Sequence, residues 1–593
     1  MVNHDYQKLE KSMNLFAEIY DLILEALGSM QSEDILPKTL DFTNVTVELP
    51  RDSLHGDMST NAAMVLAKQA NLKPREIAEV LAEKLKNDGR MSTIEVAGPG
   101  FLNLTLKKTI WLDLIPQIIR LQSDFGKSSV GQNKKVNIEF VSANPTGPLH
   151  VGHTRGAVFG DSLANLLDYV GYDVTREYYI NDGGAQVDVL ARSVYLRYLE
   201  ANGISVEFVD GTYPGDYLIP IGTSLKDSFG DTFVNAAESE WLPKFREHAV
   251  AAMMSLIRLD LSSLGIRMDV FYSEKSLYGT GRIEAALDEL NSKGLIYQGV
   301  LDAPKGKLPE DWEPRKQTLF KSSQYGDDVD RPIKKSDGKW TYFAPDIAYH
   351  YDKIMREYEH LIDIFGADHG GYVKRMKAAV IALSDDKVTL DIKLTQLVRL
   401  YKNGEPFKMS KRAGNFVKLR DLVEQVGSDV TRFVMLTRKN DAPLDFDFDK
   451  VLEQSKDNPV FYVQYAYARI YSVLTKAQKA NIDISDETLI LADMHLLGHE
   501  SELNIIRKIC EWPRLIELAA KHNEPHRIAF YLYELASEFH VFWSQGKDTP
   551  SLRFIDEKNV KQSHSKIAIA RSVAIVISNG LSILGVKPME EMR

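Results

Sequence analysis

The stretch VNIEFVSANPTGPLHVGH, residues 136–153, decides how this chain folds. Its first six residues, 136–141, form an apolar run that predicts a buried strand. A loop rich in proline and glycine follows, and the pattern over 153–170 predicts a helix. Because a buried strand followed at once by a helix is the repeating unit of a doubly wound parallel sheet, we expect a Rossmann-like sheet to begin here.

The rest of the chain divides around this sheet. Further strands are predicted at 174–180, 360–365 and 395–400. Mixed helical and strand patterns precede the sheet, and the chain after Val451 reads as helical to its end. We therefore expect a multidomain α/β protein with these parts: an N-terminal α+β domain (1–118), a Rossmann-like parallel-sheet domain (119–400) with an insertion at about 190–330, a connecting region with a cationic loop (401–455) and a C-terminal α-helical bundle (456–593).

Composition places the chain among ordinary globular proteins. Of its 593 residues, 44% are hydrophobic and 26% are charged, which excludes a disordered chain. The formal net charge is −11, and a negative protein repels polyanions unless its charges are segregated. The residues from Lys456 onward carry 17 basic and 17 acidic side chains, so the negative excess lies before them. This neutral C-terminal part is compatible with a polyanionic partner.

Cysteine content and targeting signals indicate where the protein works. The single cysteine, Cys510, excludes an intramolecular disulfide and a multi-cysteine zinc cluster. The first residues lack the basic and apolar regions of a signal peptide. The most apolar stretch, 573–586, is interrupted by polar residues and is too short to span a bilayer. We expect a cytoplasmic protein with no membrane segment and no zinc.

His150, Gly152 and His153 form the first group of residues that could bind a substrate or take part in a reaction. A helix N-terminus favours phosphate, imidazoles can donate to phosphate oxygens, and a glycine between them lets the backbone approach a nucleotide. The spacing therefore suits an ATP site. The ordinary alternative is that the histidines are a helix cap and a core residue, and a zinc ion would find only half of its ligands here.

A loop with three cations, Lys408, Lys411 and Arg412, forms the second such group. Such a loop can close over a triphosphate and neutralise the charge that develops on a leaving pyrophosphate. The ordinary alternative is a solvated basic loop. We expect this loop and the two histidines to converge on the same triphosphate.

Both groups resemble signatures of one enzyme class. His150-Val151-Gly152-His153 resembles the His-Ile-Gly-His signature of class I aminoacyl-tRNA synthetases. Lys408-Met409-Ser410-Lys411 resembles their Lys-Met-Ser-Lys-Ser signature, with Arg412 in place of the last serine. Further stretches resemble the arginyl-tRNA synthetase family in particular: 143–153, 331–338 with Tyr342 and Asp346, 366–369 and 445–447. The resemblance extends over nearly the whole chain.

This resemblance implies a two-step reaction: adenylation of L-arginine by ATP with Mg²⁺, then transfer of the arginyl group to the 3′ end of tRNA(Arg). It also implies a monomer with no bound prosthetic group, an N-terminal domain (1–118) that binds tRNA and a helical C-terminal domain (456–593) that binds the anticodon. The implied catalytic residues are His150, His153, Lys408 and Lys411, and the implied ATP-binding residues are His150, Gly152, His153, Asp368, His369, Met409, Ser410 and Lys411. Arg412 removes a hydroxyl from the signature but adds positive charge.

Recognition of arginine requires carboxylates, because a guanidinium presents a planar fork of donors that a carboxylate accepts. Glu139 and Asp346 are the candidates, and Glu139 stands out because it lies in an apolar strand. The ordinary alternative for either is a surface charge. By resemblance, Tyr342 would line the same pocket, and Ser142, Asn144 and His153 would face the amino and carboxylate ends of arginine.

The C-terminal part is rich in aromatic residues. Tyr462, Tyr465 and Trp543 could offer faces on which unstacked anticodon bases pack. Most aromatic residues at helical spacing are more simply explained as core. We expect a tRNA-binding surface made by a minority of them.

Three rival functions fit parts of the same pattern. One is another nucleotidyltransferase with a His-x-Gly-His signature, and the second is a class I synthetase for a different amino acid. The third is a catalytically silent RNA-binding protein derived from a synthetase. The joint presence of both histidines and both signature lysines argues against the third.

Overall fold

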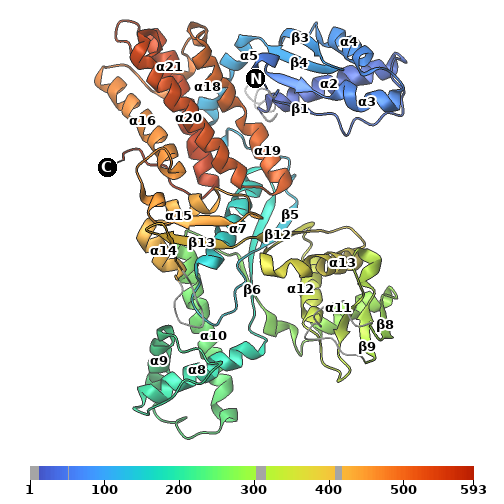
Figure 1. Cartoon of the computed structure of the whole chain (residues 1–593), viewed down its shortest axis with the longest axis vertical. Helices are drawn as coiled ribbons and strands as arrows, with labels where there is room; N and C mark the ends of the chain where they lie inside the picture. The colour runs from blue at the N-terminus through green and yellow to red at the C-terminus, as the bar shows by residue number, and fades with distance from the viewer. Residues whose placement is uncertain (1–12, 51, 302–314, 408–416, 593) are drawn as a thin grey trace, which may run out of the picture.

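The computed structural model describes residues 13–50, 52–301, 315–407 and 417–592. A helical bundle occupies one end of the long axis, with an N-terminal α+β unit beside it (Figure 1). A parallel sheet lies in the middle, and two smaller lobes extend beyond it. This is the multidomain α/β architecture that the sequence predicted.

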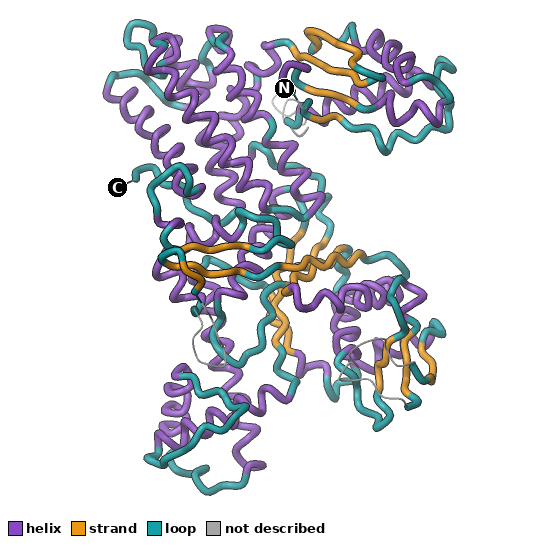
Figure 2. The backbone as a smooth tube through the Cα atoms, in the orientation of Figure 1, coloured by secondary structure: helices purple, strands orange, loops and turns teal. Residues whose placement is uncertain are grey.

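The central sheet has five parallel strands in the order β12-β11-β5-β6-β7 (Figure 2). Their bounds are β5 (Lys135–Glu139), β6 (Asp173–Ile180), β7 (Val270–Ser273), β11 (His360–Gly366) and β12 (Thr389–Thr395). The chain adds β6 and β7 on one side of β5 and then returns to add β11 and β12 on the other. The strand order therefore reverses between β5 and β11, and ligands bind at the carboxyl ends of strands at such a point.

The helix that follows β5 is α7 (Val151–Tyr169), so it begins two residues earlier than predicted. It begins there because His150 caps it. Gly160 of α7 lies against Phe140, where an added Cβ would come within 2.3 Å of the Phe140 ring. This close approach seats the helix directly on the strand end.

The N-terminal unit contains an antiparallel sheet of order β1-β2-β4-β3. Its elements are α2 (Leu15–Ser32), β1 (Val47–Glu48), η1 (Ser53–His55), β2 (Met58–Thr60), α3 (Ala62–Ala70), α4 (Pro74–Leu85), β3 (Met91–Ala97) and β4 (Phe101–Leu106), followed by α5 (Lys108–Leu112), α6 (Leu114–Leu121) and η2 (Gln122–Asp124). Buried Asp57 joins this unit to the bundle: it accepts from the Leu106 N–H (2.8 Å) and pairs with Arg507 (2.9 Å).

Two lobes extend from the central sheet. The first has its own aromatic core and consists of α8 (Ala185–Ala201), η3 (Asp216–Leu218), α9 (Ile219–Phe229) and α10 (Glu238–Ser263). The second consists of η4 (Glu274–Leu277), α11 (Arg282–Ser292), β8 (Ile296–Gly299), β9 (Gln317–Phe320), η5 (Ser322–Tyr325), β10 (Arg331–Lys334), α12 (Phe343–Met355), η6 (Ala367–Tyr372) and α13 (Val373–Ser384). Strand β7 lies within the predicted insertion at about 190–330, yet it pairs with β6 in the central sheet.

The prediction of a single strand at 395–400 is wrong. Strand β12 ends at Thr395, and β13 (Val398–Lys402) joins a separate sheet of order β14-β13-β15. The chain turns between them because Arg155 donates to the Gln396 carbonyl (3.0 Å) and Gln396 N–H donates to Asn440 (2.8 Å). The neighbouring elements are β14 (Glu405–Pro406), α14 (Leu419–Val426), α15 (Ser428–Met435), β15 (Leu444–Asp447) and η7 (Lys450–Leu452).

The C-terminal bundle consists of α16 (Pro459–Lys479), α17 (Asp486–Ile490), η8 (Met494–Leu496), α18 (Glu500–Cys510), α19 (Trp512–His522), α20 (His526–Asp548), η9 (Pro550–Leu552) and α21 (Val560–Ile583). Among the described residues, α21 alone is long and apolar enough to cross a membrane. However, 83% of its apolar stretch is buried, and it packs against α16, α18 and α20. Its apolar side chains are therefore explained by the core of this bundle.

Replacing Gly160 with alanine tests the contact between α7 and β5. The new methyl group would overlap Phe140, so Gly160→Ala should lower the free energy of unfolding by about 1–3 kcal/mol, measured by urea denaturation. Gly28→Ala is the matched control, because Gly28 also lies in a helix but has open space around it. The control should be neutral or more stable by up to about 1 kcal/mol. Equal effects of the two changes would contradict the close contact.

Candidate active site

The two histidines close the N-terminus of α7. His150 Nδ1 accepts from the Gly152 N–H (3.1 Å), and His153 Nδ1 accepts from the His150 N–H (3.2 Å). Their rings stack with centroids 3.9 Å apart. Because both Nδ1 atoms accept, the ring proton of each neutral imidazole is on Nε2. The histidines do cap the helix, as the ordinary alternative held, but neither is a core residue, since both are partly exposed.

A short backbone pairing joins the histidine segment to the chain that follows the cationic loop. Val151 N–H donates to the Val417 carbonyl (3.1 Å), and Leu419 N–H donates to the Leu149 carbonyl (2.9 Å). His150 lies opposite Lys418 in this pairing. Lys408, Met409, Ser410, Lys411 and Arg412 lie outside the described residues. The loop that carries them therefore runs between Phe407 and a residue hydrogen-bonded to the start of α7.

A groove of about 900 Å³ lies beside the two histidines. It is lined by the 144–150 loop, His153, Gln186 and the segment 208–217. Tyr217 donates to the Thr146 carbonyl (2.8 Å), and Asn144 donates to Gln186 (2.8 Å), so the first lobe is fastened to this loop. The volume suits a nucleotide-sized ligand.

The turn after β5 has a strained backbone. Val141 and Ser142 have φ of +71° and +38°, and the Ser142 N–H donates to the Phe140 carbonyl (3.0 Å), which forms a γ-turn around Val141. A left-handed conformation is rare for a β-branched residue and costs about 1–3 kcal/mol. Surrounding bonds hold it: Ser142 Oγ donates to Glu139 (2.9 Å) and accepts from the Tyr179 N–H (3.0 Å). The hydroxyl of Ser142, predicted to face the substrate, is thus engaged within the protein.

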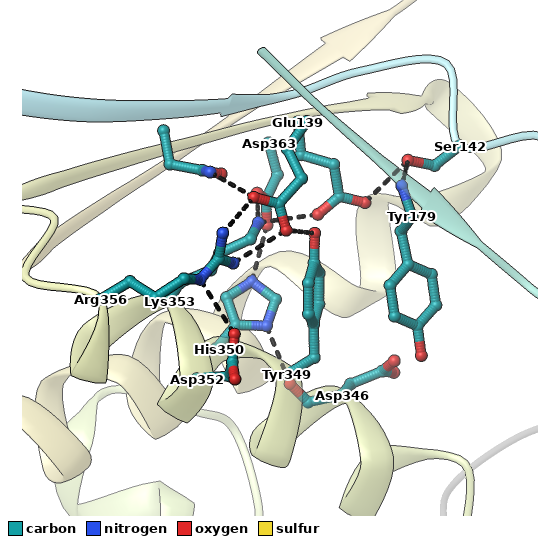
Figure 3. Close-up of polar contacts among 12 residues, drawn as sticks. Glu139, Ser142, Tyr179, Asp346, Tyr349, His350, Asp352, Lys353, Arg356 and Asp363 are labelled. Carbon is teal, nitrogen blue, oxygen red and sulfur yellow. Dashed lines mark hydrogen bonds and ion pairs between the residues drawn. The ribbon is translucent and has the colours of Figure 1, made fainter. Parts of the chain in front are cut away.

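Charged side chains, most of them buried, fasten α12 to strands β5, β6 and β11, and we call this set the ionic seam (Figure 3). It comprises the buried carboxylates Glu139, Glu177 and Asp363 from the sheet, buried His350 and Lys353 from α12, and the partly exposed Arg356 directly after α12. Lys353 donates to Glu139 (2.7 Å) and Asp363 (3.0 Å), and Arg356 binds Glu177 through two bonds (2.7 and 2.8 Å). All three carboxylates therefore have cationic partners.

Protonation within the ionic seam follows from its geometry. Both ring nitrogens of His350 lie within hydrogen-bond distance of oxygen atoms, Asp363 Oδ2 and the Asp346 carbonyl, each at 2.8 Å. Burial alone would raise the pKa of Asp363, but Lys353 and His350 hold it below its ordinary value. Burial opposes the charge on Lys353, yet Asp363 and Glu139 outweigh it and raise its pKa. The seam is charged on both sides.

Glu139 has different contacts from those that the sequence predicted. It is 5% exposed, and its two oxygens bind Ser142 Oγ and Lys353 Nζ. If Glu139 also bound the guanidinium of a substrate, it would do so while keeping its bonds to Ser142 and Lys353. Glu139 is therefore best described as the residue that joins the strained turn to the ionic seam.

A second group of acids lies at the other end of α12, and we call Asp346, Glu274, Tyr179 and Tyr278 the acidic cluster. Burial, with a smaller contribution from Glu274 and Glu139, raises the pKa of Asp346 to about 7. The Tyr372 hydroxyl, which donates to Asp346 (2.7 Å), and His350 oppose this rise. Burial also raises the pKa of Glu274, which accepts from Tyr278 (3.0 Å). Arg246 and His350 partly offset these charges, but within the described ranges no Lys or Arg forms an ion pair with either carboxylate.

Tyr179 adds an unfilled hydrogen-bonding position to the acidic cluster. Its side chain is buried, and its hydroxyl has no hydrogen-bond partner among the described residues. Figure 3 shows this hydroxyl directed toward the Asp346 carboxylate. Tyr342, which immediately precedes α12, is 79% exposed. A ligand with several N–H donors would complete this cluster.

Comparison with known proteins identifies the family. Three family models match successive parts of the chain: "Arginyl tRNA synthetase N terminal domain" at 17–106, "tRNA synthetases class I (R), catalytic domain" at 115–210 and "DALR anticodon binding domain" at 463–592. The arginine–tRNA ligase of Ruegeria pomeroyi is 70% identical over 581 residues, which cover 98% of this chain and 100% of that protein. The arginine–tRNA ligase of Roseobacter denitrificans is 67% identical with the same coverage.

The chain belongs to the arginyl-tRNA synthetase family. It is an arginine–tRNA ligase with a class I catalytic domain, so the predicted family and enzyme class are confirmed. The arginyl-tRNA synthetase of Thermus thermophilus has a TM-score of 0.75 at 19% identity, over 98% of this chain and 100% of that one. The Plasmodium falciparum structure has a TM-score of 0.71 at 17% identity, over 98% and 99%. These two structures share the fold of the synthetase.

The remaining predicted residues lie in two places. Asp368 and His369 lie in η6, directly after β11 and at the same sheet edge as Glu139. Tyr462, Tyr465 and Trp543 lie in the C-terminal bundle. There Arg469 lies over the rings of both Tyr465 (4.4 Å) and Trp543 (5.3 Å), and Tyr462 packs against His540. Tyr465 is 38% exposed, so part of its ring is accessible.

Among the described ranges, no group of three or more His, Cys, Asp or Glu side chains could hold a metal ion. Mg²⁺ would enter the reaction together with the ATP substrate.

Sequence reasoning missed Glu274, Tyr179 and the cations of the ionic seam. Asp363 carried the same signal as Glu139, an acid inside an apolar strand, and could have been found. Glu274 directly follows β7, so recognising that strand would have placed it at the carboxyl edge of the sheet. Lys353 carried no local signal, because its partners are distant in sequence.

Replacing Lys353 with methionine tests the ionic seam. The change leaves buried Glu139 and Asp363 without their shared cation, and it should lower the free energy of unfolding by about 3–5 kcal/mol, measured by urea denaturation. Lys38→Met is the control, because Lys38 forms an ion pair that is largely exposed on both sides. The control should change stability by less than about 0.5 kcal/mol. A comparable small loss for Lys353→Met would show that the seam does not hold α12.

Proposed function

We propose that the crevice between β5 and β11 activates L-arginine with MgATP and then transfers the arginyl group to the 3′ end of tRNA(Arg). The observation that carries this proposal is the acidic cluster. Asp346 and Glu274 have no Lys or Arg partner within ion-pair distance among the described residues, and the buried Tyr179 hydroxyl beside them has no acceptor. A guanidinium supplies both the missing charge and several donors in one plane.

The chemistry requires positioning and charge stabilisation. An arginine carboxylate oxygen bonds to the α-phosphorus while the bond to pyrophosphate breaks, and no covalent enzyme intermediate forms. The ribose hydroxyl of the tRNA then attacks the arginyl carbonyl carbon, and AMP leaves. The protein therefore needs only to place charges and hydrogen-bond donors around ATP and arginine.

The nucleotide roles follow the geometry at α7. The Nε2–H groups of His150 and His153 would donate to the α-phosphate region, and Gly152 would let adenosine approach the backbone. Lys408 and Lys411 would neutralise the departing pyrophosphate, because their loop ends at the residues paired with His150. Four further residues would complete ATP binding: Asp368, His369, Met409 and Ser410.

Arginine would lie with its guanidinium on Asp346 and Glu274 and its α-carboxylate toward α7. Tyr342 would cover the side chain, and Glu139, Ser142, Asn144 and His153 would shape the end that carries the amino and carboxylate groups. We extend the proposal to a cytoplasmic monomer without a prosthetic group. Its tRNA would contact Tyr462, Tyr465 and Trp543 of the helical domain (456–593), while the N-terminal domain (1–118) and the region 401–455 flank the catalytic domain (119–400).

Charging of total tRNA with each labelled amino acid tests this function. Only arginine should become attached, and ATP–pyrophosphate exchange should depend on arginine when tRNA is present. Charging with another amino acid would indicate a class I synthetase of different specificity. Binding of tRNA without any charged product at saturating ATP and arginine would indicate a silent RNA-binding protein.

Replacing Asp346 with asparagine should weaken arginine recognition selectively. A buried charge-assisted bond contributes about 2–5 kcal/mol when one partner is truncated, so the KM for arginine should rise at least about thirtyfold. The KM for ATP, measured in the same exchange assay, should change by less than threefold, because the acidic cluster is separate from α7. Equal increases in both KM values would contradict the assignment.

Arginine binding should depend on pH through Asp346. Its pKa of about 7 means that the carboxyl is protonated below neutrality in the free enzyme, and a protonated carboxyl cannot pair with a guanidinium. The KM for arginine should therefore fall as pH rises from 6 to 7 and level off toward pH 8. Because a raised pKa also means that ionisation opposes folding, the ligand-free protein should become slightly less stable over the same range. A KM for arginine that does not change between pH 6 and 8 would count against this role.

A further inference from the structure

Asp260 lies in the last turn of α10 and is 2% exposed. Its two carboxylate oxygens have separate partners. Oδ2 accepts from the Leu149 N–H at 3.0 Å, and Oδ1 accepts from Arg420 at 2.9 Å. One buried carboxylate therefore binds both the residue before His150 and the first turn of α14.

Leu149 is fixed from both sides. Its N–H is held by Asp260, its carbonyl accepts from the Leu419 N–H at 2.9 Å, and its side chain is fully buried. Leu419 is the first residue of α14, and Arg420 is the second. Asp260, Leu149 and α14 thus form a closed ring of contacts at the point where the histidine segment meets the end of the cationic loop.

We propose that Asp260 is a positioning residue that sets His150 and the end of the loop carrying Lys408 and Lys411 in a fixed relation to each other. This inference rests on the proposed function, because it assumes that these two segments bind the same ATP. Asp260 does not touch ATP in this role. It acts through the Leu149 backbone on one side and through Arg420 on the other.

Energetics indicate that this carboxylate does not serve stability. Burial raises the pKa of Asp260 above its ordinary value even though Leu149 and Arg420 oppose the shift. Its charged form is therefore less favourable here than in water. Replacing a buried ion pair is often neutral for stability or even stabilising. The presence of a charged residue at this buried position is better explained by its role in positioning Leu149 and Arg420 than by a contribution to folding stability.

Asp57 provides a matched control pair elsewhere in the molecule. It is also a buried aspartate that accepts one backbone N–H, from Leu106, and one arginine, Arg507. It joins the N-terminal unit to the bundle and contacts neither signature segment. Asp57→Asn and Arg507→Met therefore remove the same chemistry without disturbing the proposed coupling.

The experiment measures single-turnover arginylation by rapid quench, at saturating MgATP, arginine and tRNA(Arg), with unfolding midpoints for every variant. Asp260→Asn keeps an acceptor for Leu149 but turns an amide toward Arg420, and Arg420→Met removes the cation. Each should slow single-turnover arginylation about 10- to 100-fold, the scale of a displacement of about 1 Å. The KM for arginine, measured separately by ATP–pyrophosphate exchange with tRNA present, should stay within about twofold. Arg420→Lys should restore most of the rate.

Coupling is tested by combining the changes. Because both residues act through one contact, the double variant Asp260→Asn/Arg420→Met should be no slower than the slower single variant. The control variants should react within about twofold of the wild-type rate. If Asp260→Asn fails to fold, Arg420→Met carries the test, since the Arg420 side chain is 40% exposed.

The outcomes separate the two proposals. A wild-type protein that charges no tRNA with arginine overturns the proposed function. The positioning role alone is overturned if the wild-type protein charges tRNA and the Asp260→Asn and Arg420→Met variants react within twofold of the wild-type rate. It is also overturned if these two variants react no more slowly than the control variants. The positioning role would also be overturned if the rate reduction in the double variant equalled the product of the two single reductions. Such independent effects would not require a contact shared by Asp260 and Arg420.

Discussion

The ionic seam between α12 and the central sheet is the interaction on which the active crevice depends. Charges that are buried must be paired with good geometry, because an unpaired charge costs several kcal/mol, about 3–5 when a partner is removed. Lys353, Glu139 and Asp363 meet this condition only when α12 lies in one position on the sheet. That position presents Asp346, at the other end of the helix, beside Tyr179. The need to pair the buried charges therefore also fixes the position of Asp346, the carboxylate that we propose binds arginine.

A second constraint acts at the start of α7, where we propose that ATP binds. The strained turn at Val141 directs the chain from β5 into the loop that ends at His150, and backbone bonds then join that loop to residues 417–419. Arg155 adds four bonds from α7 to backbone carbonyls at Gln396, Ala442 and the segment 438–439. Segments nearly 300 residues apart in sequence are thus held at fixed separations. A reaction that proceeds by positioning alone requires this rigidity.

Much of this arrangement could be predicted from local sequence. The apolar strand at 136–141, the helix after it and the two signatures are continuous patterns, and each one gave an element or a family assignment that the comparisons confirm. What could not be predicted depends on contacts across the chain. Lys353 finds its partners only after folding, β7 is too short to stand out, and the break at Gln396 is imposed by Arg155. Val141 adopts a conformation that its residue type disfavours, which no propensity could indicate.

In the acidic cluster, two carboxylates with raised pKa values lie near a buried phenol hydroxyl, and none of the three forms an ion pair or hydrogen bond with a Lys or Arg of the described residues. A small molecule held by this cluster binds the native state and not the unfolded chain, so it shifts the folding equilibrium by mass action. If arginine occupies this cluster as proposed, it stabilises the native state of its ligase as well as serving as a reactant. The fraction of folded enzyme would then fall when the cell runs short of this amino acid.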